Sequence, residues 1–323
     1  MPRRTHPTRT TARTTRTTRT AAVAAGLALA AGLGLGLAAC APAADDGRHD
    51  VVAAFYPLEY VAERVGGAHV AVTSLTPPGG ESHDLELSPS AVAGLGEADL
   101  VVYLSGFQAA TDAAVASTAP AHTVDAAQAA ALEVAPDGVA PGTSGTSGTG
   151  SLDPHFWLDP TRLADVGHQV ADALAEVDPD HAAEFAGAAD DLAADLDALD
   201  GELAAGLAAC RGATLVASHE AFGYLAQRYG LHQVGLSGID PEVEPSPARL
   251  RDVAATVRAE GVRTLYFEVL TSPKVTQTLA EDLGVGTAVL DPLEGRTEGD
   301  DRDYLDIMRD NLDALASGLV CAG

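Results

Sequence analysis

The sequence predicts an α/β protein with two parallel-sheet lobes, each with helices on both faces, joined by one long spanning helix. Short apolar runs typical of strands alternate with helical stretches in both halves of the chain. Between the halves, a stripe of large apolar residues recurs at helical spacing without a break. A chain of this length also suits two lobes better than one small core.

Residues 49–177 are expected to form the N-terminal lobe. Apolar runs predict its four strands at 51–56, 70–75, 100–105 and 122–126. Helical stretches lie between them at 57–67, 88–98 and 107–117. Near the end of this lobe runs GTSGTSGTGS, a composition typical of a flexible segment, so we predict a flexible loop over 138–151.

Residues 211–323 repeat the scheme and are expected to form the C-terminal lobe. The predicted strands are 213–218, 232–236, 264–269 and 287–291. The predicted helices are 220–230, 246–261, 272–284 and a last one from about 301 to 319.

Residues 178–210 predict the spanning helix. Asp178-Pro179 is a favourable start, with a capping carboxylate followed by proline in the first turn. The apolar stripe consists of Phe185, Leu192, Leu196, Leu199, Leu203 and Leu207. An uninterrupted helix of this length would extend about 45–50 Å, which is enough to span both lobes and to limit their hinging.

Residues 1–39 have the pattern of a secretory signal. Residues 1–20 contain six arginines and no acid, 21–39 are uncharged, and small residues precede Cys40. A cysteine at the cleavage position resembles the bacterial lipobox, so we expect a lipidated Cys40, a tether over 40–48 and anchoring on the outer face of the cytoplasmic membrane. A transmembrane helix over 21–39 is the alternative, but this Ala- and Gly-rich run is weakly hydrophobic.

The chain is strongly acidic. Without the six leader arginines, the 19 basic residues fall to 13 against 46 acidic ones, a net charge of −33. Such a surface repels nucleic acid and raises the local concentration of cations. We therefore expect no nucleic-acid partner.

Two cysteines remain once Cys40 is set aside. Cys210 and Cys321 form an even pair in an exported protein, where the oxidising compartment favours a disulfide. Two buried thiols are the alternative.

Three histidines stand apart from the others. His83 lies in a turn-rich loop after a strand, His219 ends a strand, and His155 lies between two Asp-Pro pairs in SLDPHFWLDP. Ligands of parallel sheets bind beyond the carboxyl ends of the strands, and Asp291 ends the last strand there. Three imidazoles and a carboxylate at one sheet edge predict a site for a first-row transition metal. The other histidines that follow the predicted signal are interpreted as surface or packing residues: His49, His69, His122, His168, His181 and His232.

Five segments carry a family resemblance. ESHDLELSPS, LDPHFWLDP, ASHEAFGYLAQRYGL, GIDPEVEPSP and AVLDPLEG resemble the metal-binding lipoproteins that supply zinc and manganese ABC importers, the ZnuA-like substrate-binding family. The resemblance extends from about residue 50 to the C-terminus and implies the metal-type periplasmic-binding-protein fold. It implies that His83, His155 and His219 bind the ion between the lobes, with Asp291 as the family's carboxylate. Many zinc members have a histidine-rich loop before the DPH segment, and this chain has GTSGTSGTG there instead.

The resemblance implies a substrate-binding protein with Zn²⁺ as its cargo, an ABC permease and its ATPase as partners, and no catalytic activity. A histidine at 219, where manganese-type relatives tend to have a carboxylate, favours zinc over manganese or iron. We expect a monomer. The fourth ligand stays open between Asp291, a water and Glu81. Candidate hydrogen-bond partners of the ligating histidines are Glu81, Asp153, Asp159 and Glu268.

Two other functions are compatible with a bound metal. His219-Glu220 suggests a zinc hydrolase, but a metalloprotease helix needs a second histidine four residues after the first, where this chain has Gly223. A metal-binding surface adhesin is the other alternative.

Overall fold

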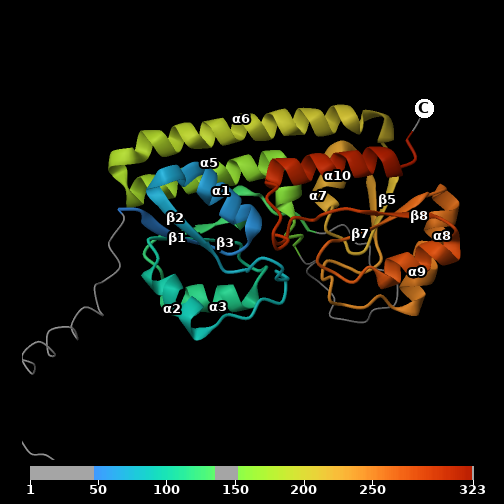
Figure 1. The fold of residues 1–323 in the computed structure, drawn as a ribbon, viewed down its shortest axis with the longest axis horizontal. Helices are drawn as coiled ribbons and strands as arrows, with labels where there is room; N and C mark the ends of the chain where they lie inside the picture. The colour runs from blue at the N-terminus through green and yellow to red at the C-terminus, as the bar shows by residue number, and fades with distance from the viewer. Residues whose placement is uncertain (1–46, 135–151, 322–323) are drawn as a thin grey trace, which may run out of the picture. The chain divides into compact units, whose positions relative to one another are not determined.

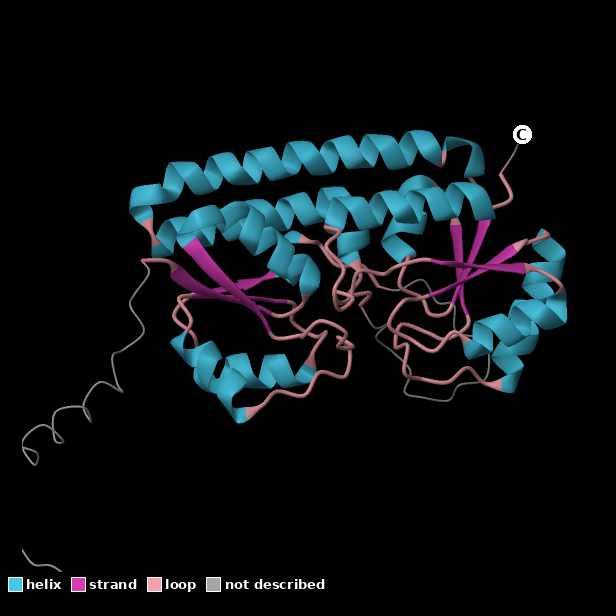
Figure 2. Ribbon diagram, viewed as in Figure 1, coloured by secondary structure: helices cyan, strands magenta, loops and turns pink. Residues whose placement is uncertain are grey.

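The computed structural model describes residues 47–134 and 152–321, and the following account is confined to them. The predicted signal, Cys40, most of the tether and the whole of the predicted loop 138–151 lie outside these ranges, so those predictions stay untested. The fold class is confirmed: the described chain contains two four-stranded parallel sheets flanked by helices (Figures 1 and 2).

The N-terminal lobe is built on a sheet of strand order β2-β1-β3-β4. Its strands are β1 (His49–Ala53), β2 (Val70–Ser74), β3 (Leu100–Tyr103) and β4 (Thr123–Asp125). Its helices are α1 (Tyr56–Gly66), α2 (Pro89–Glu97), α3 (Ala109–Thr118), α4 (Ala126–Ala129) and α5 (Pro160–Val177), with a 3-10 turn η1 (Gly67–His69) before β2. In Figure 1, α1 and α5 cover one face of the sheet and α2 and α3 the other.

The C-terminal lobe repeats this arrangement with strand order β6-β5-β7-β8. Its strands are β5 (Thr214–Ala217), β6 (His232–Gly235), β7 (Thr264–Phe267) and β8 (Gly286–Val289). Its helices are α7 (Gly223–Tyr229), α8 (Pro247–Glu260), α9 (Lys274–Leu283) and α10 (Tyr304–Gly318). In Figure 1, α8 and α9 lie together on the outer side, and α7 and α10 lie on the side toward α6.

Alternating strand residues divide each lobe's core between the two faces of its sheet. In β5, Leu215 packs into the core beneath the central helices, whereas Val216 packs with α8 and α9. In β3, Val102 likewise packs into the core beneath the central helices, whereas Val101 packs with α2 and α3. The central cluster is continuous from the N-terminal lobe through α6 into the C-terminal lobe, so the two lobes share one core layer.

The spanning helix α6 (Ala182–Gly206) packs against α1 and α5 of one lobe and α10 of the other. All six residues of the predicted apolar stripe are buried. The continuous α-helix is shorter than predicted, about 37 Å for its 25 residues. The reason is that short 3-10 turns, η3 (Pro179–His181) and η4 (Ala208–Cys210), replace α-helix at both ends.

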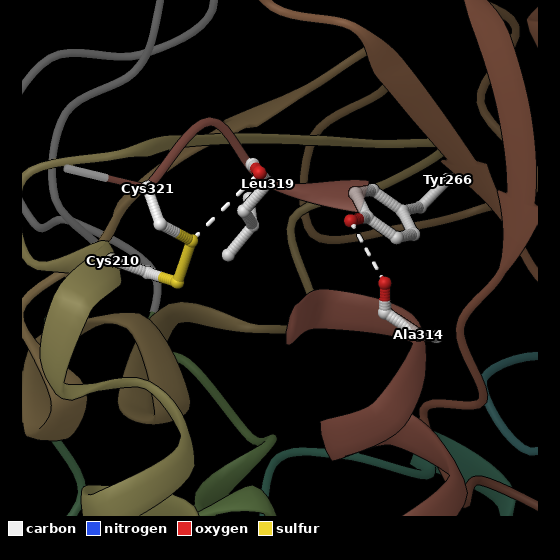
Figure 3. Close-up of a disulfide and its surroundings, with 5 residues drawn as sticks. All are labelled: Cys210, Tyr266, Ala314, Leu319 and Cys321. Atoms are coloured by element: carbon white, nitrogen blue, oxygen red, sulfur yellow. Dashed lines mark hydrogen bonds between the residues drawn. A yellow bond between two sulfur atoms is a disulfide. The ribbon is translucent and has the colours of Figure 1, made fainter. Parts of the chain in front are cut away.

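The predicted disulfide is present between Cys210 and Cys321. It joins the end of η4 to the segment after α10, as Figure 3 shows. Nearby, the Tyr266 hydroxyl donates a hydrogen bond of 3.3 Å to the Ala314 carbonyl, which links β7 to α10. Within the described ranges, no helix has the length and apolar character needed to cross a membrane.

Candidate metal centre

Four side chains that could bind a metal ion converge between the lobes. His83, His155, His219 and Glu294 each present a nitrogen or oxygen atom, and these atoms all lie within 4.8 Å of one another. The structure therefore brings together the three histidines singled out in the sequence. The carboxylate beside them is Glu294, not Asp291.

The strand order explains why these residues meet. In each sheet the strand order has a switch point between the two central strands, where consecutive strands begin to be added on the opposite side. It lies between β1 and β3 in the N-terminal sheet and between β5 and β7 in the C-terminal sheet. Ligands of open parallel sheets bind at such switch points, beyond the carboxyl ends of the strands. His219 lies two residues beyond β5, and the loops after β2 and β8 carry His83 and Glu294.

The side chain of Asp153 holds both the backbone and the ring of His155. Asp153 Oδ1 accepts a 3.0 Å hydrogen bond from the His155 backbone N–H and lies 2.8 Å from its Nδ1, so that Nε2 faces the centre. Trp157 fixes the segment on the other side by donating from Nε1 to the Pro292 carbonyl at 2.7 Å. The segment around His155 is thus anchored in both lobes.

Asp159 has a different role from the one considered in the sequence. Its carboxylate accepts a hydrogen bond from Thr161 N at 3.0 Å and caps α5, and it also lies 3.3 Å from the Arg228 guanidinium. The aspartates of the two Asp-Pro pairs therefore differ in role: Asp153 contacts His155, whereas Asp159 caps α5.

His219 has an equivalent carboxylate partner from the neighbouring strand. Glu268 Oε1, just beyond β7, lies 2.7 Å from His219 Nδ1. The opposite ring nitrogen again faces the centre, where His219 Nε2 lies 3.0 Å from Glu294 Oε1. Carboxylates on the outer nitrogens of metal-binding imidazoles orient the rings and increase their basicity.

His83 is the most accessible of the three histidines. Glu81 does not reach the centre, because its carboxylate accepts hydrogen bonds from the backbone N–H groups of His83 and Asp84, each at 2.9 Å. Glu81 thus shapes the loop that presents His83. The ring of Phe107 packs edge-on against that of His83, with 4.8 Å between centroids.

Asp291 positions Glu294 and stays out of the ligating group. Asp291 Oδ1 accepts a 2.8 Å hydrogen bond from Leu293 N, and its backbone N–H donates to Asn311. Leu293 has a φ of 59°, a left-handed conformation that is costly for a leucine. The hydrogen bond from Asp291 helps to hold this conformation, which turns Glu294 toward the histidines.

The two loops on either side of the centre are in close contact. Ser82 donates a side-chain hydrogen bond to the Glu294 carbonyl, and Gly79 N donates to the Arg296 carbonyl at 2.7 Å. A Cβ on Gly295 would lie 2.8 Å from the Gly80 carbonyl oxygen. Glycine is therefore needed at 295 for the lobes to close in this way.

The spacing of the ligating atoms fits a tetrahedral ion. His155 Nε2 lies 3.4 Å from both His83 Nε2 and His219 Nε2. Zinc–nitrogen bonds of 2.0–2.1 Å at tetrahedral angles place nitrogens about 3.3 Å apart. Glu294 Oε1 lies 3.0 Å from His155 Nε2 and His219 Nε2, and 3.4 Å from His83 Nε2.

The electrostatics favour positive charge at the centre. Burial acts to lower the pKa of His155, but hydrogen bonds to Asp153 and Glu294 outweigh it and raise this pKa. Burial also opposes protonation of His219, yet the charges of Glu294 and Glu268 raise its pKa to about 10. Burial alone would raise the pKa of Glu294, but His219 and the other two imidazoles hold it well below its ordinary value.

Glu220, the general base of the hydrolase alternative, is turned away from the centre. Its carboxylate lies 2.8 Å from Arg249 Nη2. Gly223 is required where a metalloprotease would have its second histidine, because a Cβ there would lie 2.5 Å from Asp153 Oδ2.

Comparison with known proteins identifies the family. The model of the zinc-uptake complex component A, periplasmic, matches residues 51–318. The chain is 30% identical over 310 residues to the high-affinity zinc uptake system protein ZnuA of Bacillus subtilis, covering 91% of this chain and 97% of that protein. It is 32% identical over 295 residues to the zinc-binding protein AdcA of Streptococcus pyogenes, covering 86% of this chain but only 57% of AdcA.

Solved structures agree with this. The Zn(II)-bound ZnuA-like domain of Streptococcus pneumoniae AdcA is 32% identical with a TM-score of 0.71, covering 84% of this chain and 99% of that domain. A mutant of the laminin-binding adhesin Lmb from Streptococcus agalactiae is 30% identical with a TM-score of 0.75, covering 84% of this chain and 100% of the Lmb chain. On the extent of the family match, this chain belongs to the family of zinc-uptake complex component A proteins.

Proposed function

We propose that this protein captures zinc outside the cytoplasmic membrane and delivers it to the permease of an ABC importer. The observation that carries the proposal is the convergence of three imidazole nitrogens and one carboxylate oxygen at tetrahedral spacing. His83, His155, His219 and Glu294 are the proposed ligands. The names of the family and of its relatives support zinc as the cargo.

The ligand set favours zinc over manganese or iron. Three nitrogens and one carboxylate suit a four-coordinate ion, whereas manganese prefers more oxygen ligands and higher coordination. Copper binds such ligands more tightly than zinc does, so the supply of metal in the cell envelope must exclude it.

Capture and release both follow from the two-lobe arrangement. The ligands come from loops of both lobes, so the full set exists only when the loops at 79–84 and 291–296 are in contact. Separation of these loops would remove ligands and release the ion to a permease. The acidic surface raises the local concentration of cations, and lipidation of Cys40 would keep the protein beside its transporter.

The geometry gives no support to a hydrolase. The four proposed ligands would fill a tetrahedral coordination sphere, whereas a catalytic zinc keeps a position for water. Glu220 is also paired with Arg249. We therefore propose a binding protein without catalytic activity.

Metal binding and growth test the proposal together. Protein purified without chelator should contain one tightly held zinc per chain, and His155→Ala should abolish it, while His168→Ala, at an exposed position on α5, should not. A deletion strain should grow poorly in zinc-depleted medium, and wild type but not His155→Ala should restore growth. Tighter binding of manganese than of zinc, or rescue of growth by His155→Ala, would contradict the proposal.

A further inference from the structure

A second group of imidazoles and carboxylates lies at the amino ends of the N-terminal sheet, the edge opposite the metal centre. His69 ends η1 just before β2, and Asp178 and His181 lie in the turn between α5 and α6. Figure 1 shows this turn close to the beginning of β1. Within 47–134 and 152–321, this group and the metal centre are the two sets of ligating atoms that come within 4.8 Å of one another.

The members of this amino-edge group contact one another closely. The rings of His69 and His181 stack with 4.0 Å between centroids. Asp178 Oδ2 lies 2.6 Å from His181 Nδ1 and 3.4 Å from His49 Nε2. Glu184 Oε2, from the first turn of α6, lies 3.0 Å from His69 Nε2. Three imidazoles and two carboxylates from four separate segments thus meet at one corner of the lobe.

This chemistry suits a first-row divalent metal. Asp178 is itself one of the potential ligands, together with His69 and His181. Glu184 engages Nε2 of His69 and leaves the opposite nitrogen of that ring to bind, as carboxylates do beside metal-ligating histidines. Imidazole with carboxylate is a typical ligand set for zinc and its neighbours in the series. The side chains of His69 and His181 are 29% and 39% exposed, so an ion can reach them from solvent.

The spacing of the rings indicates how the metal affinity of the amino-edge group compares with that of the metal centre. Ring centroids in the buried centre are 5.3–5.9 Å apart, whereas those of His69 and His181 are 4.0 Å apart. An ion between the latter requires the rings to turn apart, which their exposure allows. Because this reorganisation opposes binding, the amino-edge group should bind more weakly than the preorganised centre.

We propose that His69, His181 and Asp178, with Glu184 and His49 beside them, form a second, exposed site for a first-row divalent transition metal such as zinc. The site does not depend on the proposed transport function, because it shares no residue with the metal centre.

Calorimetric titration of the full mature chain with zinc tests this proposal. Wild type should show one tight event and a second, weaker one. The double variant His69→Ala/His181→Ala should keep the first event and weaken the second about tenfold or more, and His168→Ala should keep both. A single event in wild type, or a second event unchanged in the double variant, would overturn the proposal. Loss of the first event alone would instead count against the metal centre.

Histidine-ring NMR of wild type gives a readout that does not depend on the folding of a variant. After one equivalent of zinc, further zinc should shift the ring signals of His69 and His181 and leave those of His168 in place. If His69 and His181 do not respond, the second site does not exist.

Discussion

Substitution of Gly223 by alanine should weaken zinc binding although Gly223 touches no ligating atom. The added Cβ would lie 2.5 Å from Asp153 Oδ2, whereas ordinary contact begins near 3.4 Å, so the carboxylate must retreat by about 0.9 Å. Asp153 is buried, and its other oxygen holds His155 N at 3.0 Å and Nδ1 at 2.8 Å. A shift of this size takes these contacts out of hydrogen-bond range.

The expected loss of zinc affinity is the same as if the carboxylate partner of a metal-binding histidine were removed. Removal of such a partner typically weakens metal affinity by about 10- to 100-fold, which corresponds to about 1.4–2.7 kcal/mol. If the substitution acts only through Asp153, then Asp153→Ala should have a similar effect. The double variant should then lose no more than either single variant.

Zinc titration against a competing chelator measures the effect. Gly201→Ala is the matched control, because Gly201 lies within α6 and its Cβ would meet open space. It should leave zinc affinity unchanged and increase stability by up to about 1 kcal/mol. Wild-type affinity in Gly223→Ala, or additive losses in the double variant, would refute the reasoning.

Three further predictions concern stability, pH and export. Reduction or Cys210→Ser/Cys321→Ser should lower the free energy of unfolding by about 4–5 kcal/mol, because the disulfide closes a loop spanning 111 positions; denaturant titration would check this, and an unchanged midpoint would contradict it. Zinc affinity should rise with pH, by about tenfold per unit for each proton displaced, because the raised pKa values of His155 and of His219 (about 10) keep these imidazoles protonated below those values until zinc binds. Chelator competition from pH 6 to 8, corrected for protonation of the chelator, should show this slope, and a flat profile would rule it out. Cys40→Ala should give unprocessed or released protein on membrane fractionation, so normal processing and retention would exclude lipidation.

The regular elements were predictable because their apolar periodicity is strong. The eight predicted strands all form, and their observed bounds differ by a few residues at most. The stripe in α6 was equally clear, since its leucines fall on one face. Helix α5 is harder to delimit from the sequence, because Asp159-Pro160, a favourable helix start, is also the second Asp-Pro pair beside His155.

The histidines of the centre were predictable and its carboxylate was not. His155 and His219 follow from motifs and strand ends, but Asp291 and Glu294 lie in one loop, and the sequence does not determine which of them faces the histidines. That choice depends on the left-handed conformation of Leu293 and on the hydrogen bond that Asp291 makes to it. The sequence does contain one signal for the alternative ligand, because a second carboxylate residue, Glu294, lies three residues after Asp291.

The amino-edge group was missed for a related reason. His69 and His181 were interpreted singly, as surface or packing residues. Their proximity depends on the turn between α5 and α6 meeting the amino ends of β1 and β2. Such a contact is tertiary, and no local pattern in the sequence encodes it.

A crystal structure of the zinc-loaded protein, with anomalous data at the zinc edge, tests the central claim most directly. The account predicts one fully occupied ion about 2.0–2.1 Å from Nε2 of His83, His155 and His219, with a Glu294 oxygen at about 2.0–2.2 Å. Asp291 should remain hydrogen-bonded to Leu293. An ion bound away from these residues, or one coordinated by Asp291 in place of Glu294, would contradict the account.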